Sequence, residues 1–272
     1  MASVADECSM PSVYIPFPHV KPLKTVATMT IEYHPSDCDS DQDKSAAKPA
    51  TGERFDVAEI YGEGFTLDTD EYDNGTGWIL SPCPYFEHCK YCGKRPRHTD
   101  SIIVAIDGAC RGNGYAGARS SYGVYFSEYS SHNFSSVIEG SAQSSQRAEL
   151  TACMAALNRI HFFSLAVEAG FLEGLDNLSQ VIVKADSEYV VRGMTEWVPK
   201  WRLNGFKNAK GRPVVNADLF REIDGQVQKL ATRGVSCSFW HVPRGNNRQA
   251  DQLANQALEE AASLESGATS PY

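Results

Sequence analysis

The chain has 272 residues, 42% of them apolar, and a formal net charge of −9 at pH 7. This length allows one large domain, or one domain with a smaller appendage. The negative charge excludes nucleic-acid binding by overall attraction, so such a ligand requires a local basic face. The N-terminus lacks a basic region followed by an apolar stretch, and no run of about 18 apolar residues occurs, which predicts no secretory signal and no membrane span. We therefore expect an intracellular protein with reduced thiols, in the nucleus or the cytoplasm.

Residues 1–80 differ in composition from the rest of the chain. The stretch 37–52 is polar, acidic and almost without large apolar side chains, which predicts a disordered linker. Residues 53–80 carry many Gly, Asp and Glu, which predicts short, irregular structure. We divide the chain into a largely irregular N-terminal region (1–80), a Cys-rich segment (81–98), the main folded domain (99–262) and a flexible tail (263–272).

Regular periodicity begins at residue 101. Alternating or apolar runs predict strands, and apolar residues at helical spacing predict helices, the first of them with Ser144 or Ser145 as its N-cap. The strands are expected at Ser101–Ile106, Ser121–Ser127, Asn133–Glu139, Gln180–Ala185 and Val235–Val242, and the helices at Ser144–Phe162, Ser187–Trp197, Asn216–Ala231 and Asn247–Ala262. This order predicts an α/β fold with a mixed five-stranded sheet, its first three strands antiparallel, flanked by helices.

Four acidic residues fall at the boundaries of these elements. Asp107 and Asp186 follow apolar strands, whereas Glu149 and Asp251 lie near the starts of helices. Each has an ordinary alternative, because an Asp after a strand is usually a turn residue and an acid in a first helical turn complements the helix dipole. Carboxylates gathered at one end of a sheet would suit a pair of Mg²⁺ ions and phosphodiester hydrolysis.

The local contexts of the four acids resemble ribonuclease H of type 1. The motifs are D-G-x-C-x-x-N-G, Q-R-A-E, a strand followed by D-S, W-V-x-x-W, and H-V-P followed by A-D-x-L-A, over about residues 102–257. The resemblance implies that 99–262 is a catalytic domain of the ribonuclease H-like fold. It implies an endonuclease that cuts the RNA strand of RNA–DNA hybrids and leaves 5′-phosphate and 3′-hydroxyl ends.

The resemblance also implies the metals and their ligands. Two Mg²⁺ ions, or Mn²⁺ in their place, would be held by the four carboxylates. Asp107 would bridge both ions, Glu149 and Asp186 would complete one site, and Asp251 would hold the other ion. No protein partner is indicated.

Further residues match the substrate contacts of the family. They are Asn113, Ser145 and Gln146 for the RNA minor groove, where 2′-hydroxyls are displayed, and Ser144 and Asn216 for a DNA phosphate. Asn113 also fits a simple turn residue, and Gln146 a solvated residue of the first helical turn. Two positions depart from the family: Ser145 stands where Asn is usual, and Ala142 stands where Arg is frequent.

Trp197 and Trp201 are four residues apart and therefore share one helix face. Five cations and no acid follow between residues 200 and 212: Lys200, Arg202, Lys207, Lys210 and Arg212. A basic, Trp-bearing patch suits a DNA backbone through phosphate attraction and stacking. The alternative is that both tryptophans belong to the core and that the cations form a solvated loop.

Members of this family generally carry a His in the loop before the last carboxylate. Here the loop 243–251 contains no His, and His241 lies on the preceding strand, where we interpret it as structural. We expect slower turnover, because general acid–base help contributes about 10²- to 10⁴-fold where it operates. Arg244 offers partial electrostatic compensation. The alternative function is therefore a catalytically weak, ribonuclease H-like module that binds nucleic acid.

Three cysteines precede the main domain: Cys83, Cys89 and Cys92. With His88 or His98 as a fourth ligand they would form a structural zinc site. A single C-x-x-C leaves reduced thiols equally open. We interpret Cys110, Cys153 and Cys237 as small apolar core residues.

Overall fold

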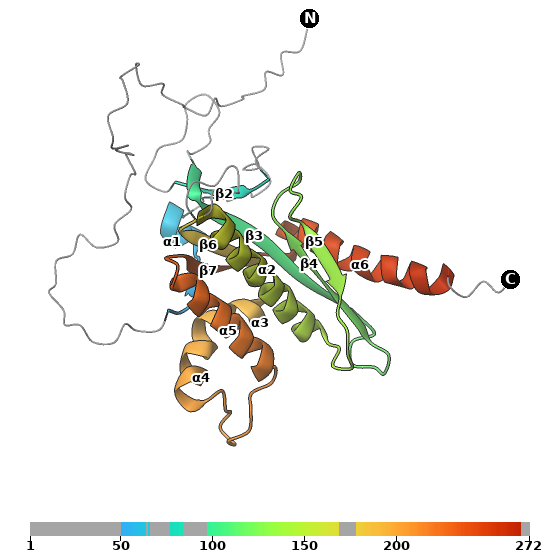
Figure 1. Cartoon of the computed structure of the whole chain (residues 1–272). Coiled ribbons are helices and arrows are strands. Elements are labelled where there is room, and N and C mark those ends of the chain that lie inside the picture. Colours follow the sequence, from blue (N-terminus) through green and yellow to red (C-terminus); the bar gives the residue numbers. More distant parts are fainter. Residues whose placement is uncertain (1–49, 64, 66–76, 84–96, 169–177, 268–272) are drawn as a thin grey trace, which may run out of the picture. The chain divides into compact units, whose positions relative to one another are not determined.

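The computed structural model describes residues 50–63, 65, 77–83, 97–168 and 178–267. A seven-stranded mixed sheet forms the centre of this part of the chain (Figure 1). Its strands are β1 (Glu53–Arg54), β2 (Ile79–Pro82), β3 (Arg97–Arg111), β4 (Arg119–Tyr125), β5 (Phe134–Val137), β6 (Gln180–Ala185) and β7 (Ser236–His241). Within the described ranges, no helix is both long and apolar enough to cross a membrane.

The strand order is β1-β7-β6-β3-β4-β5. The strands β3, β4 and β5 are antiparallel, as the sequence predicts, and β3, β6, β7 and β1 run parallel. Since β6 occupies one edge of β3, the strands β2 and β4 pair end to end along the other edge, β2 at Ile102–Ile103 and β4 from Ala105 onward. The five predicted strands are thus present, and β1 and β2 are additional.

Both additional strands come from a region predicted to be irregular. The described parts of 53–80 supply β1, the short helix α1 (Val57–Tyr61) and the start of β2. They are ordered because their few apolar side chains are buried: Phe55, Trp78, Ile79 and Leu80 are each at most 5% exposed. The sequence prediction underestimated this region because its apolar residues are separated by long polar stretches. The predictions for residues 1–49 lie outside the described residues.

The remaining helices are α2 (Ser145–Glu168), α3 (Glu188–Arg192), α4 (Val198–Asn204), α5 (Ala217–Ala231) and α6 (Arg248–Gly267), with a π-helical turn η2 (Gly193–Trp197) and a 3₁₀ turn η3 (Arg244–Asn246). Ser144 caps α2, because its hydroxyl accepts a hydrogen bond from the Arg147 amide at 3.2 Å. The predicted flexible tail begins too early, since α6 continues through residue 267. An ion pair between Arg119 and Glu265 holds this end of the helix.

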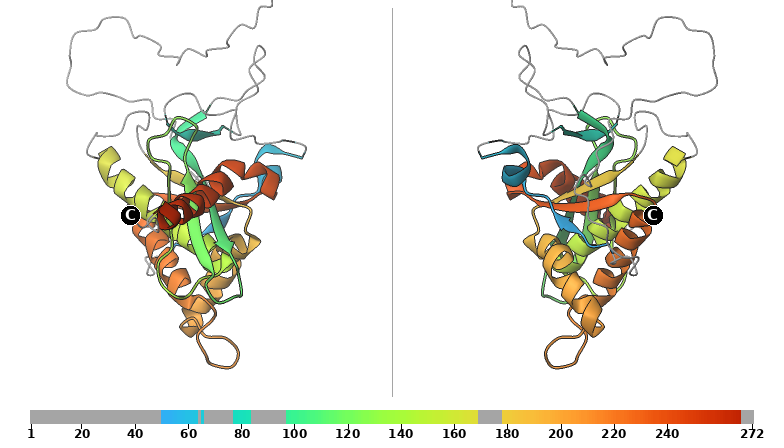
Figure 2. Two further views of the ribbon diagram at one scale, coloured as in Figure 1. Left: turned by 90° about the vertical axis from the view of Figure 1, so that its right-hand side faces the viewer. Right: turned by 90° about the vertical axis from the view of Figure 1, so that its left-hand side faces the viewer.

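The helices cover the two faces of the sheet separately (Figure 2). Alternate residues of β3 point to opposite faces. Ile102 and Ile106 pack in the main core beneath α2 and α5, whereas Ile103 joins a second cluster on the other face with Ile182 and Trp240. The helix α6 covers β4 and β3 on this second face.

Two glycines let the helices approach the sheet backbone. A β-carbon added at Gly108 of β3 would lie 2.2 Å from the amide nitrogen of Glu149 in α2, and one added at Gly123 of β4 would lie 2.5 Å from the carbonyl oxygen of Ala250 in α6. Gly123 pairs with Asp107. Both helices are therefore seated beside Asp107, with their own acids next to the contact.

We expect Gly108→Ala to lower the free energy of unfolding by about 1–3 kcal/mol, because the new methyl group overlaps the backbone of α2. Denaturant-induced unfolding measures the change. Gly225→Ala is the matched control, since no heavy atom lies within 4 Å of a β-carbon at that position of α5. A Gly108→Ala protein as stable as the parent would contradict the close contact.

Candidate active site

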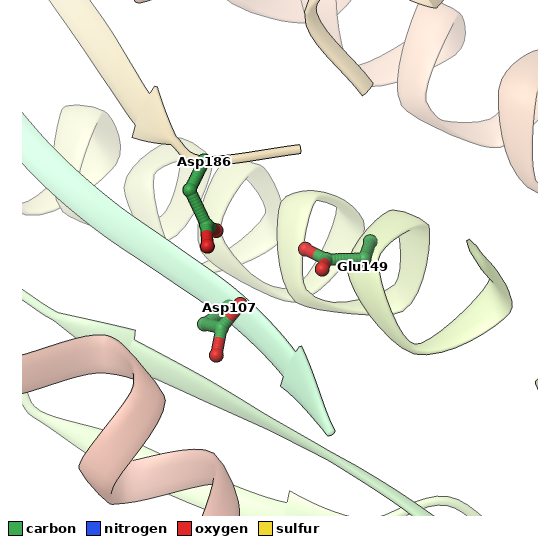
Figure 3. A group of neighbouring side chains, drawn as sticks. All are labelled: Asp107, Glu149 and Asp186. Atoms are coloured by element: carbon green, nitrogen blue, oxygen red, sulfur yellow. The ribbon is translucent and has the colours of Figure 1, made fainter. Parts of the chain in front are cut away.

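Three of the four predicted acids meet at one place. Asp107, Glu149 and Asp186 each offer a carboxylate oxygen, and these atoms all lie within 4.8 Å of one another (Figure 3). Asp107 lies on β3, Glu149 in the second turn of α2, and Asp186 directly after β6. Parallel pairing of β3 and β6 brings the two aspartates to the same end of the sheet. No second group of this kind occurs among the residues that the structure describes.

The fourth acid, Asp251, lies on the first turn of α6 and is not part of this triad. Its carboxylate accepts a hydrogen bond from Arg244 Nη2 at 3.0 Å. The charge of Asp251 nevertheless acts on Asp107, since it contributes to the raised pKa of that residue. The fold therefore places a compact triad beside a fourth carboxylate that is already paired with a cation.

The gathering of like charges changes the acidity of the triad. Burial, followed by the negative charges of Asp186 and Asp251, raises the pKa of Asp107 from 3.8 to about 7. Burial and the charges of Asp107 and Asp186 also raise the pKa of Glu149 well above its usual value. Both shifts show that the folded chain holds negative charge where it is unfavourable without a counter-charge.

The donor set fits a divalent cation. Carboxylate oxygens are the hard ligands that Mg²⁺, Mn²⁺ and Ca²⁺ prefer. Glu149 Oε2 is buried and accepts no hydrogen bond from the described residues. A buried acceptor without a partner carries a free-energy cost that a bound cation removes. The triad therefore has both the ligand type and an uncommitted ligand atom that a metal site requires.

Asn247 is a site residue that the sequence analysis did not identify. Its side chain is 1% exposed, and Nδ2 donates to the carbonyl oxygen of Ile106 at 2.9 Å and to Asp186 Oδ1 at 3.2 Å. It thus ties the carboxylate of Asp186 to the backbone of β3. The sequence shows only that an amide side chain lies four residues before Asp251. Its contact with β3 cannot be read from the sequence, because the two segments meet only in the fold.

Arg244 is one of two arginines in the His-less loop 243–251. It begins η3 and bonds Asp251, and its positive charge lowers the pKa of Glu149 in part, against the larger effect of burial. The interpretation of Arg244 as a partial electrostatic substitute for the missing His stays a prediction. His241 lies on β7, where the sequence analysis placed it.

The predicted minor-groove residues lie at the start of α2. Asn113, in the turn after β3, donates from Nδ2 to Ser145 Oγ at 3.2 Å and accepts from the Ser145 amide at 3.4 Å. Gln146 is exposed. Asn113 therefore fixes the β3–β4 turn to the helix, which accounts for its place in the motif independently of any substrate.

The predicted phosphate-site residues meet at Arg147. Arg147 Nη1 donates to Asn216 Oδ1 at 3.3 Å, and the side chain forms an ion pair with Asp218 at 2.8 Å. Asn216 also donates to the Tyr189 hydroxyl at 3.2 Å. Ser144 caps the same helix turn. The structure thus brings Ser144 and Asn216 to one cationic residue, and their contact with DNA stays a prediction.

Trp197 and Trp201 lie side by side, with ring centroids 5.7 Å apart. Trp201 also packs edge-on against Phe220 at 5.2 Å and belongs partly to the core, as the alternative interpretation stated. Arg202 is not a solvent-facing cation, because it forms a mostly buried ion pair with Asp224. The other cations of the patch are exposed: Lys200, Lys207, Lys210 and Arg212.

Of the residues predicted to bind zinc, Cys83 is buried, while Cys89, Cys92 and His88 lie outside the described residues. His98 Nδ1 lies 3.8 Å from Asp100 Oδ1. The zinc site stays a prediction. Cys153 and Cys237 are buried core residues, as predicted, and burial raises the pKa of both thiols. Cys110 is only half-buried.

In this mixed sheet the central strand β3 supplies one acid, the helix α2 supplies a second, and the end of the parallel strand β6 supplies the third. This arrangement defines an α/β protein with a cluster of carboxylates of the kind that binds metal ions. The RNase H family model matches residues 99–259, which is more than half of the chain. This chain belongs to the RNase H family.

Two curated relatives carry the ribonuclease H name. Ribonuclease H1 of Rattus norvegicus is 28% identical over 166 residues, covering 60% of this chain and 52% of the relative, so the chain spans about half of that protein's length. Ribonuclease H of Halorhodospira halophila is 35% identical over 164 residues, covering 58% and 93%. RNase H1 of the archaeon Halobacterium salinarum, known from a crystal structure, is 26% identical, covers 59% of this chain and 98% of its own, and has a TM-score of 0.35.

We expect the metal-free protein to lose stability as the pH rises through about 7. Asp107 binds its proton more tightly in the folded state, where its pKa is about 7, than at its ordinary value of 3.8. This contribution is fully present below pH 3.8 and is lost as the pH rises through 7. Calorimetric melting in EDTA between pH 5 and pH 8 measures the decline. It should be smaller in Asp107→Asn, and an equal decline in that variant would contradict the assignment.

We expect Asn247→Ala to weaken binding of Mn²⁺ by about 10- to 100-fold, because removal of a side chain that orients a ligand typically has this effect. Titration calorimetry with the metal alone measures it. The exposed neighbour Asn246 provides the control variant Asn246→Ala, which should bind Mn²⁺ like the parent. Unchanged affinity in Asn247→Ala would show that Asp186 does not depend on this amide.

Proposed function

We propose that this chain is a Mg²⁺-dependent endonuclease that hydrolyses the RNA strand of RNA–DNA hybrids and leaves 5′-phosphate and 3′-hydroxyl ends. The observation that carries the proposal is the triad of buried Asp107 and half-buried Glu149 and Asp186, with oxygens within 4.8 Å, in a chain of the RNase H family. The proposed cofactor is a pair of Mg²⁺ ions, with Mn²⁺ as an alternative.

The four acids would divide between two ion positions. Asp107, Glu149 and Asp186 would hold one ion, and Asp107 with Asp251 the other. Two such ions supply an activated water as nucleophile and stabilise the leaving oxygen of a phosphodiester. Asp107 must lose its proton to serve both positions, and its raised pKa makes metal binding proton-coupled near neutral pH. Asn247 keeps Asp186 oriented during this change.

The start of α2 relates the metal centre to the substrate. Ser145 and Glu149 are four residues apart in this helix and therefore lie on one face. The hydrogen-bonded pair of Asn113 and Ser145 thus lies one turn from a metal ligand. Hydroxyl and amide groups at this place suit recognition of a ribose 2′-hydroxyl next to the scissile phosphate.

The DNA strand would lie against the basic patch. Trp197 offers a partly exposed ring, and the cations Lys200 in α4 and Lys207, Lys210 and Arg212 after this helix are exposed. Their positive charge provides the local basic face that an acidic chain requires for nucleic acid. Asn216 and Ser144, joined through Arg147, would hold a DNA phosphate between this patch and α2.

One contact favours the second candidate, a weakly catalytic module that binds hybrids. Arg244 already neutralises Asp251, so a cation in the second position must compete with this ion pair. Binding of the hybrid without cleavage at saturating Mg²⁺ would identify that function.

We expect Asp107→Asn to abolish hybrid cleavage and to leave the fold intact, because the amide removes charge repulsion but cannot bridge two cations. The assay titrates Mg²⁺ with labelled RNA–DNA hybrid, double-stranded RNA and double-stranded DNA, and it maps the product ends. Glu260→Gln, an exposed carboxylate-to-amide change on α6, is the control and should cleave like the parent. Undiminished cleavage by Asp107→Asn would refute the proposed site.

A further inference from the structure

Residues 50–55, which we call the strap, lie before the part of the chain that the family model matches. The strap contacts the elements that carry the tryptophans. It runs beside η2 and β7 and reaches α4 and α5 through side-chain hydrogen bonds. It is therefore in a position to influence the Trp-bearing face without touching the carboxylates.

A single backbone oxygen joins the strap to two helices. The carbonyl oxygen of Ala50 accepts hydrogen bonds from Arg202 Nη2 of α4 at 2.7 Å and from Gln228 Nε2 of α5 at 2.5 Å. Arg202 also bonds both carboxylate oxygens of Asp224 in α5, with Nε to Oδ2 at 2.7 Å. The Arg202 and Asp224 side chains are 17% and 12% exposed. Arg202 thus connects α4, α5 and the strap in a largely water-excluded place, where a charged group requires all its partners.

The strap is seated on β7 by its backbone. Glu53 and Arg54 pair in parallel with Ser238 and Phe239, and the Phe55 amide donates to the Phe239 carbonyl at 2.9 Å. A β-carbon at Gly52 would lie 2.5 Å from the buried Phe239 ring and 3.4 Å from the Met194 carbonyl oxygen of η2. The residue at 52 must therefore be small for the strap to stay in place.

The helix α4 needs such support. It has seven residues and continues α3 through the π-helical turn η2, so the regular α-helical hydrogen-bond pattern is interrupted just before it. Its direction depends on what its side chains contact, and Trp201 and Arg202 face α5 in adjacent positions. We propose that Arg202 is a positioning residue and that the strap, through Arg202, holds α4 so that Trp197 and Trp201 present a fixed face to the bound hybrid. This inference rests on the proposed function of the same surface.

The test uses the full chain with the substitutions Arg202→Ala, Gly52→Ala and both together. Steady-state cleavage gives KM and kcat, and hybrid dissociation constants are measured separately in the Asp107→Asn background. We expect KM and the dissociation constant to rise about tenfold, which is about 1.4 kcal/mol of binding free energy, with kcat changed by less than about twofold. Both substitutions disrupt the same connection between the strap and α4. The double variant should therefore bind the hybrid no more weakly than Arg202→Ala alone.

Matched controls separate this effect from a general loss of stability. Arg119→Ala removes an exposed ion pair between Arg119 of β4 and Glu265 of α6, and Gly225→Ala adds a methyl group in open space on α5. Both should leave KM unchanged. Arg202→Lys keeps one charged donor and should give an intermediate KM, which also decides the question if Arg202→Ala does not fold.

Unchanged KM and dissociation constant in Gly52→Ala and Arg202→Lys, with only a lower melting temperature, would overturn the positioning role. An equal fall in kcat without a change in KM would overturn it as well. A parent protein that binds the hybrid but does not cleave it contradicts the proposed function alone, because the dissociation constants still test the strap.

Discussion

The site depends on three carboxylates that repel one another and that the fold prevents from moving apart. Asp107 is 3% exposed and faces two further acids of the triad, so its ionised form is disfavoured both by burial and by charge. The carboxylates cannot separate, because Asp107 is part of the longest strand and Glu149 is fixed to it where α2 contacts Gly108. Packing of the sheet against α2 therefore supplies the free energy that holds the acids together. A divalent cation would offset this cost, so metal binding and folding are linked.

Several cations outside the triad are paired with acids. Arg111, Arg119 and Arg147 form ion pairs with Glu259, Glu265 and Asp218. Lys200, Lys207, Lys210 and Arg212 are exposed and concentrate positive charge in α4 and in the loop that follows it. A net charge of −9 is therefore compatible with hybrid binding, since a local potential at short range determines contact with the backbone.

Elements with a regular apolar pattern were predicted from the sequence. Elements and residues that depend on contacts with distant parts of the chain were missed. The strand Gln180–Ala185 was predicted with its observed bounds because it is buried on both faces and reads as a continuous apolar run. By contrast, β1 consists of two exposed charged residues held by backbone bonds, which no side-chain pattern encodes. The acids were found because each has a local motif. Asn247 was missed because its partner, the Ile106 carbonyl, is 141 residues away.

The folded unit and the family domain are consequently not the same segment. The family match begins at residue 99, yet Phe55 and Ile79 complete the cluster that covers Ile103 and Trp240 on the second face of the sheet. Burying an apolar side chain of this size contributes about 1.5–3 kcal/mol, so these residues represent a large share of a typical domain stability. The strand β1 also covers the edge of β7, which would otherwise present unpaired backbone groups. The segment before the family match therefore stabilises the same sheet that gathers the carboxylates, and through Arg202 it contacts the helix that carries Trp201.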